Sequence, residues 1–201
     1  MPNMPLAPIE ELEIRAALRE WLEDWRRDRS IVVEEFRIER GASRIDLAAI
    51  NNELVGYEIK SDRDTFVRFS NQIHAYNRVF DHINLVCGQL HAERAMSVIP
   101  AWWGIIVATR EADNAVRLHV KRASTRNTKQ SAFSLASLLW KDEEIAALAS
   151  AEDVAAPLQN ASAHTLWESV ARHLSVGTIH SIVTESLLKR QNHNDLAVKT
   201  M

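Results

Sequence analysis

Two acidic side chains and a lysine stand in neighbouring apolar segments of the 201-residue chain. Asp46 lies within residues 43–50, among Ile, Leu and Ala, and Glu58 and Lys60 form an E-I-K triplet within residues 53–60. A spacing of two places Glu58 and Lys60 on one face of a strand. If the two segments pair across the turn between them, Asp46 shares that face. Charged groups are costly in a sheet unless they meet one another or a cation, so this grouping indicates a functional site.

The chemistry that fits these three groups is metal-assisted hydrolysis of a phosphodiester. Two close carboxylates repel each other, and the repulsion raises their proton affinity unless a cation intervenes. A hard ion such as Mg²⁺ takes oxygen ligands, keeps several waters and commonly meets phosphate. It lowers the pKa of a bound water and stabilises charge on a phosphate oxygen. Lys60 could hold the water or offset the charge on phosphorus. The alternative is a structural salt-bridge cluster on a solvated face.

Helical and strand periodicities predict the elements that would position these side chains. They are a helix over 9–27, strands over 31–39, 43–50 and 53–60, a helix over 64–80, a strand over 82–87, a helix over 90–98 and strands over 103–109 and 115–122. The first three strands should form an antiparallel meander, because tight turns join them. In the second strand, Ile45, Leu47 and Ala49 should share one face and Asp46 the other. In the first helix, the apolar stripe comprises Ile9, Leu12, Ala16, Leu18, Trp21, Leu22 and Trp25.

The strand signal ends after residue 122, and helices are predicted over 133–149, 163–174 and 178–190, with a break at Gly177. We therefore expect an α/β protein with a C-terminal helical appendage. The predicted division is a flexible lead at 1–8, an α/β domain at 9–122, a basic loop at 123–132, the appendage at 133–190 and a disordered tail at 191–201.

The spacing of the charged residues resembles the signature of a known superfamily. Asp46, eleven further residues and the E-I-K triplet at 58–60 resemble the D…(D/E)-x-K signature of the PD-(D/E)XK nucleases. Gln72 and Tyr76, on the next predicted helix, resemble the Q-x-x-x-Y motif of its RecB-like branch. The predicted order of helix, three strands, helix and strand is similar to the core of that superfamily. Residue 45 is Ile where the signature has Pro, so that half of the signature gives no support.

Two longer stretches, GASRID at 41–46 and GYEIKSD at 56–62, resemble a small and mostly uncharacterised bacterial family within that superfamily. The resemblance implies a restriction-endonuclease-like mixed sheet flanked by helices, and a nuclease dependent on Mg²⁺ or Mn²⁺. It implies the following roles: Asp46, Glu58 and the Ile59 carbonyl as metal ligands, Lys60 positioning the attacking water, Gln72 and Tyr76 supporting the site or touching substrate, and Glu13 and Glu35 as further acidic candidates. The alternative for Gln72 and Tyr76 is an ordinary structural role.

The net charge of −3 excludes a protein that coats nucleic acid through overall basicity. It hides a local excess of cations, because no acid occurs between Asp113 and Asp142. A local excess can hold a phosphate backbone and release counterions, although a solvated loop is the alternative. The candidate nucleic-acid contacts are Lys121, Arg122, Arg126 and Lys129 in this interval and Arg44, Arg63 and Arg68 near the carboxylates. We expect DNA in preference to RNA.

Other classes of protein are disfavoured by what the sequence lacks. The chain has one cysteine, Cys87. We expect its side chain to be buried in the fold and the protein to lie in a reducing compartment. It has no apolar run near the ~20 residues of a membrane span and no secretory signal, so we expect a cytoplasmic protein without a membrane partner. Two functional alternatives stay open: a non-cleaving protein that binds nucleic acid or another protein, and a nuclease subunit active only in a larger assembly. Homodimerisation through the C-terminal helices and a role in DNA repair or defence are further hypotheses.

Overall fold

The computed structural model describes residues 8–25, 30–64, 69–149 and 160–191. The elements are α1 (Glu11–Trp25), β1 (Ile31–Ile38), η1 (Glu39–Gly41), β2 (Ser43–Ile50), β3 (Leu54–Lys60), α2 (Phe69–Asn77), β4 (His82–Gly88), η2 (Gln89–His91), α3 (Ala92–Val98), β5 (Gly104–Arg110), β6 (Val116–Arg122), α4 (Ala132–Ala136), α5 (Lys141–Ala149), α6 (Ala163–His173) and α7 (Val176–Gln191). None of the helices in these ranges is both long and apolar enough to cross a membrane.

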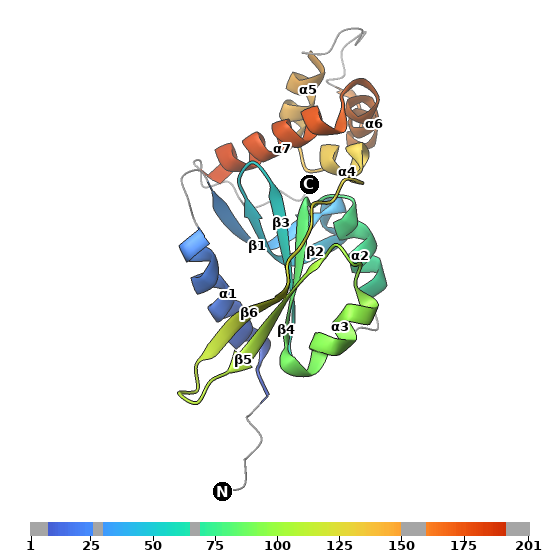
Figure 1. Cartoon of the computed structure of the whole chain (residues 1–201). Coiled ribbons are helices and arrows are strands. Elements are labelled where there is room, and N and C mark those ends of the chain that lie inside the picture. Colours follow the sequence, from blue (N-terminus) through green and yellow to red (C-terminus); the bar gives the residue numbers. More distant parts are fainter. Residues whose placement is uncertain (1–7, 26–29, 65–68, 150–159, 192–201) are drawn as a thin grey trace, which may run out of the picture.

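One six-stranded mixed sheet, in the order β1-β2-β3-β4-β5-β6, forms the centre of the molecule (Figure 1). The predicted antiparallel meander is confirmed by the pairing of β1 with β2 and of β2 with β3. Strand β4 returns parallel to β3 after helix α2, β5 is parallel to β4, and β6 is antiparallel to β5. The prediction of an α/β fold with a mixed sheet, flanking helices and C-terminal helices is therefore confirmed.

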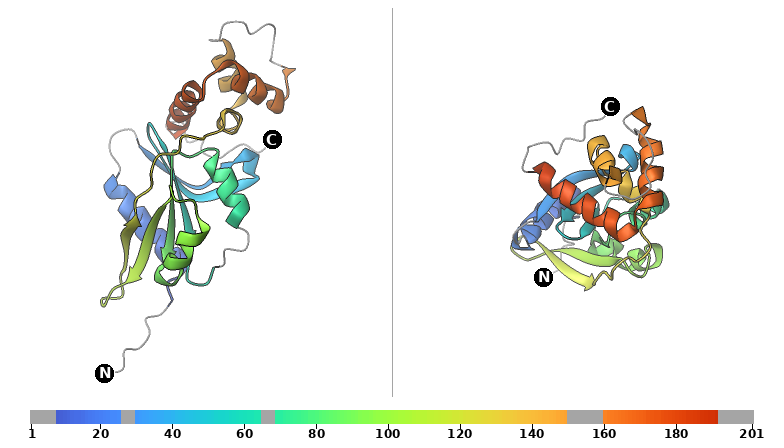
Figure 2. Two further views of the ribbon diagram at one scale, coloured as in Figure 1. Left: turned by 45° about the vertical axis from the view of Figure 1, so that its right-hand side comes forward. Right: turned by 90° about the horizontal axis from the view of Figure 1, so that it is seen from above.

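Helices cover both faces of the sheet (Figure 2). Helix α1 packs on one face, where Ile14, Leu18 and Leu22 join Leu47 and Tyr57 in one core cluster. Helices α2 and α3 pack on the other face in a second cluster, which also contains the buried Cys87 that the sequence predicted. The α1 face and the α2 face are named below after these helices.

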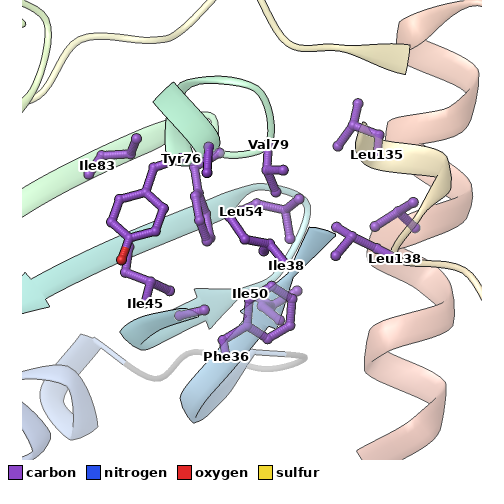
Figure 3. Packing of buried hydrophobic residues seen from close by; sticks show 14 of the residues in the cluster. Phe36, Ile38, Ile45, Ile50, Leu54, Tyr76, Val79, Ile83, Leu135 and Leu138 are labelled. Atoms are coloured by element: carbon purple, nitrogen blue, oxygen red, sulfur yellow. The ribbon is translucent and has the colours of Figure 1, made fainter. Parts of the chain in front are cut away.

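The C-terminal helices α4–α7 lie across one end of the sheet and extend the core of the α2 face (Figure 1). Leu135 of α4 and Leu138 approach Leu54 and Val79 at the end where β3 begins (Figure 3). The sheet and these helices thus share one apolar cluster. The predicted boundary between two domains at residues 123–132 stays a prediction.

The structure corrects several predicted details of the helices. The core-facing stripe of α1 contains Ile14 in place of Leu12, which is 76% exposed, and Ala16 is also exposed. The helix predicted over 133–149 is two helices, because the chain turns after Ala136. The break before α7 falls at residues 174–175, so Gly177 lies inside that helix. Residues 150–159, between the predicted helices at 133–149 and 163–174, lie outside the described residues.

Candidate functional site

Strands β2 and β3 separate at the point where Asp46 lies. Their pairing ends at Leu47 opposite Tyr57, and one further step would place Asp46 opposite Glu58. Instead, the Ile59 N–H donates a hydrogen bond to the Asp46 carboxylate, with 2.7 Å between N and Oδ2. The side chain of Asp46 thus takes the place of a backbone acceptor on the neighbouring strand. This hydrogen bond fixes Oδ2 of Asp46 and keeps the carboxylate near Glu58.

Glu58 is 2% exposed and is surrounded by donors. Its Oε1 accepts hydrogen bonds from Lys60 Nζ at 2.7 Å and from Gln72 Nε2 at 3.0 Å. Its Oε2 lies 2.8 Å from the Tyr76 hydroxyl. Burial, helped by the nearby Asp46, raises the pKa of Glu58 to about 7 against the lowering effect of Lys60. A bound cation would therefore stabilise the charged form of the Glu58 carboxylate.

Tyr76 links the two strands from helix α2. Its hydroxyl lies 2.5 Å from the Arg44 carbonyl on β2 as well as near Glu58, and Gln72 Nε2 donates to it at 3.1 Å. Because a hydroxyl has one proton, Tyr76 donates to only one of its two acceptors at a time. Burial raises the pKa of Tyr76, so the hydroxyl stays protonated and keeps this donating role. Gln72 and Tyr76 are thus brought to the site, as predicted.

Asp46 is bound on its other oxygen by an arginine that the motifs did not indicate. Arg15 of α1 is 8% exposed, and its Nη2 lies 3.0 Å from Asp46 Oδ1, 2.7 Å from Glu11 and 3.2 Å from Glu35. Burial raises the pKa of Asp46, while the Ile59 N–H and Arg15 act against that shift. One signal could have identified Arg15: it stands three and seven residues before Leu18 and Leu22, on the side of the helix that faces the core.

Glu35 lies at an irregular point of strand β1. It has a φ of 53°, and the pairing of β1 with β2 leaves out Glu35 and Asp46, which lie opposite each other because the register is the same on both sides of them. Its carboxylate contacts Arg15 at 3.2 Å and Arg44 Nε at 2.6 Å. The backbone conformation is unfavourable for a residue with a Cβ, and such conformations concentrate at functional sites.

The regular alternation predicted for β2 is wrong at Asp46. Ile45 joins the core of the α2 face, whereas Leu47 and Ala49 join that of the α1 face. The two strands are unpaired at Glu35 and Asp46, and this interruption with its left-handed residue lets the side chains on either side of Asp46 face opposite ways.

Two of the other predicted acidic and basic residues lie elsewhere. Glu13 binds Arg110, with 2.9 Å between Oε2 and Nη2, and this hydrogen bond lowers the pKa of Glu13. It is not among the contacts of Asp46 or Glu58. Arg63 is exposed and forms an ion pair with Glu10 at 2.9 Å. Arg68 lies outside the described residues.

Most cations of the predicted basic segment bind other groups of the protein. Arg122 donates to the carbonyls of Trp103 and Pro100, and Arg126 binds Asp81 and Glu53. Lys121 binds Glu93, and Lys129 is exposed. Arg122 and Arg126 thus hold the loop onto the sheet, which leaves them less available for a nucleic acid.

The carboxylates can be tested as a metal site on their donor chemistry. Within the described ranges, no group of three or more His, Cys, Asp or Glu side chains could hold one ion. Asp46 and Glu58 offer two carboxylates, and the carbonyl of Ile59 should point to the same side as its N–H, toward Asp46. Mg²⁺ binds through one or two carboxylates while it keeps several waters, so this set fits a magnesium-like ion.

Comparison with known proteins gives the family of the chain. The family model of bacteriophage P4 protein cII matches residues 5–201. Protein cII of Enterobacteria phage P4 is 24% identical over 136 residues, which cover 67% of this chain and 51% of that protein. The match therefore spans about half the length of that relative. A solved structure, the SPO1766 protein of unknown function from Silicibacter pomeroyi, is 21% identical over 61% of this chain and 75% of its own, with a TM-score of 0.44.

These comparisons overturn the resemblance drawn from the sequence motifs. The expected membership of the PD-(D/E)XK superfamily and its RecB-like branch is wrong, because the family that matches almost the whole chain is a different one. The reason is that a few charged residues at set distances describe a local arrangement of groups, which unrelated chains can reach. The match to residues 5–201 is far more extensive than those motifs. This chain belongs to the bacteriophage P4 cII protein family.

Proposed function

We propose that this protein is a nuclease dependent on Mg²⁺ or Mn²⁺ that hydrolyses phosphodiester bonds, in DNA in preference to RNA. One observation carries the proposal. Where two strands separate, the carboxylates of Asp46 and Glu58 are close enough to interact electrostatically, and the Lys60 ammonium lies 2.7 Å from Glu58. Two carboxylates and a carbonyl can hold a hard cation that activates water and polarises a phosphate, and an ammonium beside them can hold the water or offset charge.

Each residue of the site has a defined task in this proposal. Asp46 and Glu58 would hold the ion, with the Ile59 carbonyl as a third oxygen. When bound, the ion supplies a polarised phosphate oxygen and a water of lowered pKa. Lys60 holds that water or offsets charge on the phosphate. Tyr76 and Gln72 keep Glu58 in place from helix α2, and the Ile59 N–H does the same for Asp46.

The test is cleavage of labelled DNA and RNA of one sequence, single- and double-stranded, with Mg²⁺, Mn²⁺ or EDTA. The wild-type protein should cleave only with metal. Asp46→Asn and Lys60→Met should each lower the rate at least roughly 100-fold, because each removes a group that acts on the reacting atoms. Arg117→Gln, an exposed position on β6, serves as the matched control and should cleave normally. Activity that survives both substitutions would contradict the proposal.

A second function is favoured by the ion pairs of the site. Arg15 and Lys60 already compensate Asp46 and Glu58, so the cluster is also consistent with a protein that binds nucleic acid without cleaving it. Salt-sensitive binding with no cleavage in any metal would favour this function. Activity only after addition of a co-purifying protein would instead indicate a subunit of a larger nuclease.

A further inference from the structure

Two arginines face each other across strands β1 and β2, next to the candidate site. Arg37 and Arg44 are direct partners in the antiparallel register, and both are exposed. Side chains directly opposite in such a pair lie about 5 Å apart at Cβ, and like charges there are destabilising. This arginine pair therefore lowers the stability of the fold unless an anion compensates its positive charge.

The protein itself compensates only part of this charge. Glu35 binds Arg44, with 2.6 Å between Oε2 and Nε. In the part of the chain that the structure describes, no carboxylate lies within ion-pair distance of Arg37. The arginine pair thus has a net positive charge.

Both side chains project from the α1 face of the sheet. The neighbours of Arg37 along β1, Phe36 and Ile38, lie in the core of the α2 face, and so does Ile45 beside Arg44. Since successive side chains alternate along a strand, the two arginines point the other way. This is also the face from which Arg15 reaches Asp46.

The position of the pair is tied to the carboxylates. Arg44 stands two residues before Asp46, which is about 7 Å along a strand. Its carbonyl lies 2.5 Å from the Tyr76 hydroxyl, which also contacts Glu58. A phosphate held by the pair would therefore lie beside Asp46, on the face of the sheet from which Arg15 also reaches that carboxylate.

We infer that Arg37 and Arg44 form a phosphate clamp, which binds the backbone of a nucleic-acid strand beside Asp46. The inference rests on the proposed function for its choice of ligand. Guanidinium groups suit this task because they present several donors in a plane that matches phosphate oxygens. The clamp replaces the segment at 121–129 as the main contact, since Arg122 and Arg126 there have structural partners.

The experiment measures binding of fluorescein-labelled DNA by anisotropy in EDTA, across a series of salt concentrations. Arg37→Gln and Arg44→Gln should each weaken binding roughly 3- to 10-fold and lower the salt slope by about one. Arg117→Gln on β6 should change neither quantity. Arg37 has no ion-pair partner within the described residues, so its substitution should leave the fold intact, which circular dichroism checks.

The outcomes separate the clamp from the hydrolytic function. Unchanged affinity and salt slope in both arginine variants would overturn the clamp, as would arginine-dependent binding of poly-glutamate that exceeds the binding of DNA. Arginine-dependent DNA binding by a protein that cleaves nothing would support the clamp and contradict the hydrolytic function. Asp46→Asn should still bind DNA in EDTA, because the clamp does not use its carboxylate.

Discussion

Three buried carboxylates in this protein are held in different ways, and their surroundings decide their protonation. Burial raises the pKa of both Glu58 and Glu144 to about 7. Burial also acts to raise the pKa of Asp81, yet hydrogen bonds from His180 and the Leu54 N–H outweigh it and the pKa is lowered. The first two groups favour the folded state when protonated and the third when charged.

Glu144 provides a residue-scale test away from the candidate site. Its Oε1 accepts from Trp167 Nε1 at 2.6 Å, while its Oε2 is buried and has no hydrogen-bond partner within the described residues. Because the pKa is raised, the stability that Glu144 contributes is complete below pH 4.5 and is lost as the pH rises through about 7. Glu144→Gln should therefore stabilise the protein by roughly 1–3 kcal/mol at pH 8 and by much less at pH 4.

Thermal unfolding at the two pH values measures this difference. Glu168→Gln, at a half-exposed position on α6, is the matched control and should shift Tm little at either pH. A Glu144 variant that is equally stabilised or destabilised at both pH values would contradict the titration of this carboxylate.

At the residue scale, the sequence predicted the centre of the site but not its surroundings. Asp46, Glu58 and Lys60 could be predicted because charged residues in apolar strands need partners, and two-residue spacing brings them together. Arg15 could not be predicted with the same ease, since an arginine in an amphipathic helix is usually exposed. Its partners come from three elements, and only the tertiary fold brings them within 3.2 Å of one guanidinium.

At the scale of elements, irregular strands position the site. Glu35, with its positive φ, lies where the pairing of β1 with β2 is interrupted, and its carboxylate contacts Arg15 and Arg44. At the same point β2 loses its simple alternation between Ile45 and Leu47. The sequence predicted strands here from β-branched and apolar residues, but an interrupted pairing leaves no periodic signal when the residue with positive φ is not Gly. The meander could be predicted because tight turns join its strands. The parallel pairing of β4 with β3 follows because a helix connects them.

A second element-scale contact docks helix α7 onto the sheet. Asp81, which is 0% exposed, follows α2 and binds His180 of α7 at 2.6 Å, the Leu54 N–H at 2.8 Å and Arg126 at 3.3 Å. Asp81→Asn removes the charge that all three partners use. It should destabilise the protein by about 3–5 kcal/mol at neutral pH, as expected when a buried ion pair loses one partner.

The pH dependence of this contact has the opposite sign to that of Glu144. Because the pKa of Asp81 is lowered, its contribution is present above the unfolded value of 3.8 and is lost as the pH falls below it. Urea unfolding of Asp81→Asn at neutral pH measures the loss of stability. Glu185→Gln, at an exposed position that pairs with Lys189 on α7, is the control. Equal midpoints for the two variants at neutral pH would contradict the docking role.

At the scale of the whole molecule, the net charge of −3 is an average over distinct local groups. Carboxylates gather where β2 and β3 separate, arginines face each other on the adjoining hairpin, and the cations at 121–126 bind mainly to the protein itself. A weak net charge is therefore compatible with local binding of a polyanion. The metal proposal rests on the geometry of Asp46, Glu58 and Lys60.

That proposal is tested most directly by diffraction from crystals soaked in Mn²⁺, with data collected at the manganese absorption edge. We predict an anomalous peak between the carboxylates of Asp46 and Glu58, beside the Ile59 carbonyl, which is absent in Asp46→Asn crystals soaked in the same way. The ion would compete with Arg15 for Asp46 Oδ1, so the guanidinium should move toward Glu11 and Glu35. Crystals that hold no manganese between these two carboxylates at saturating Mn²⁺ would contradict the account.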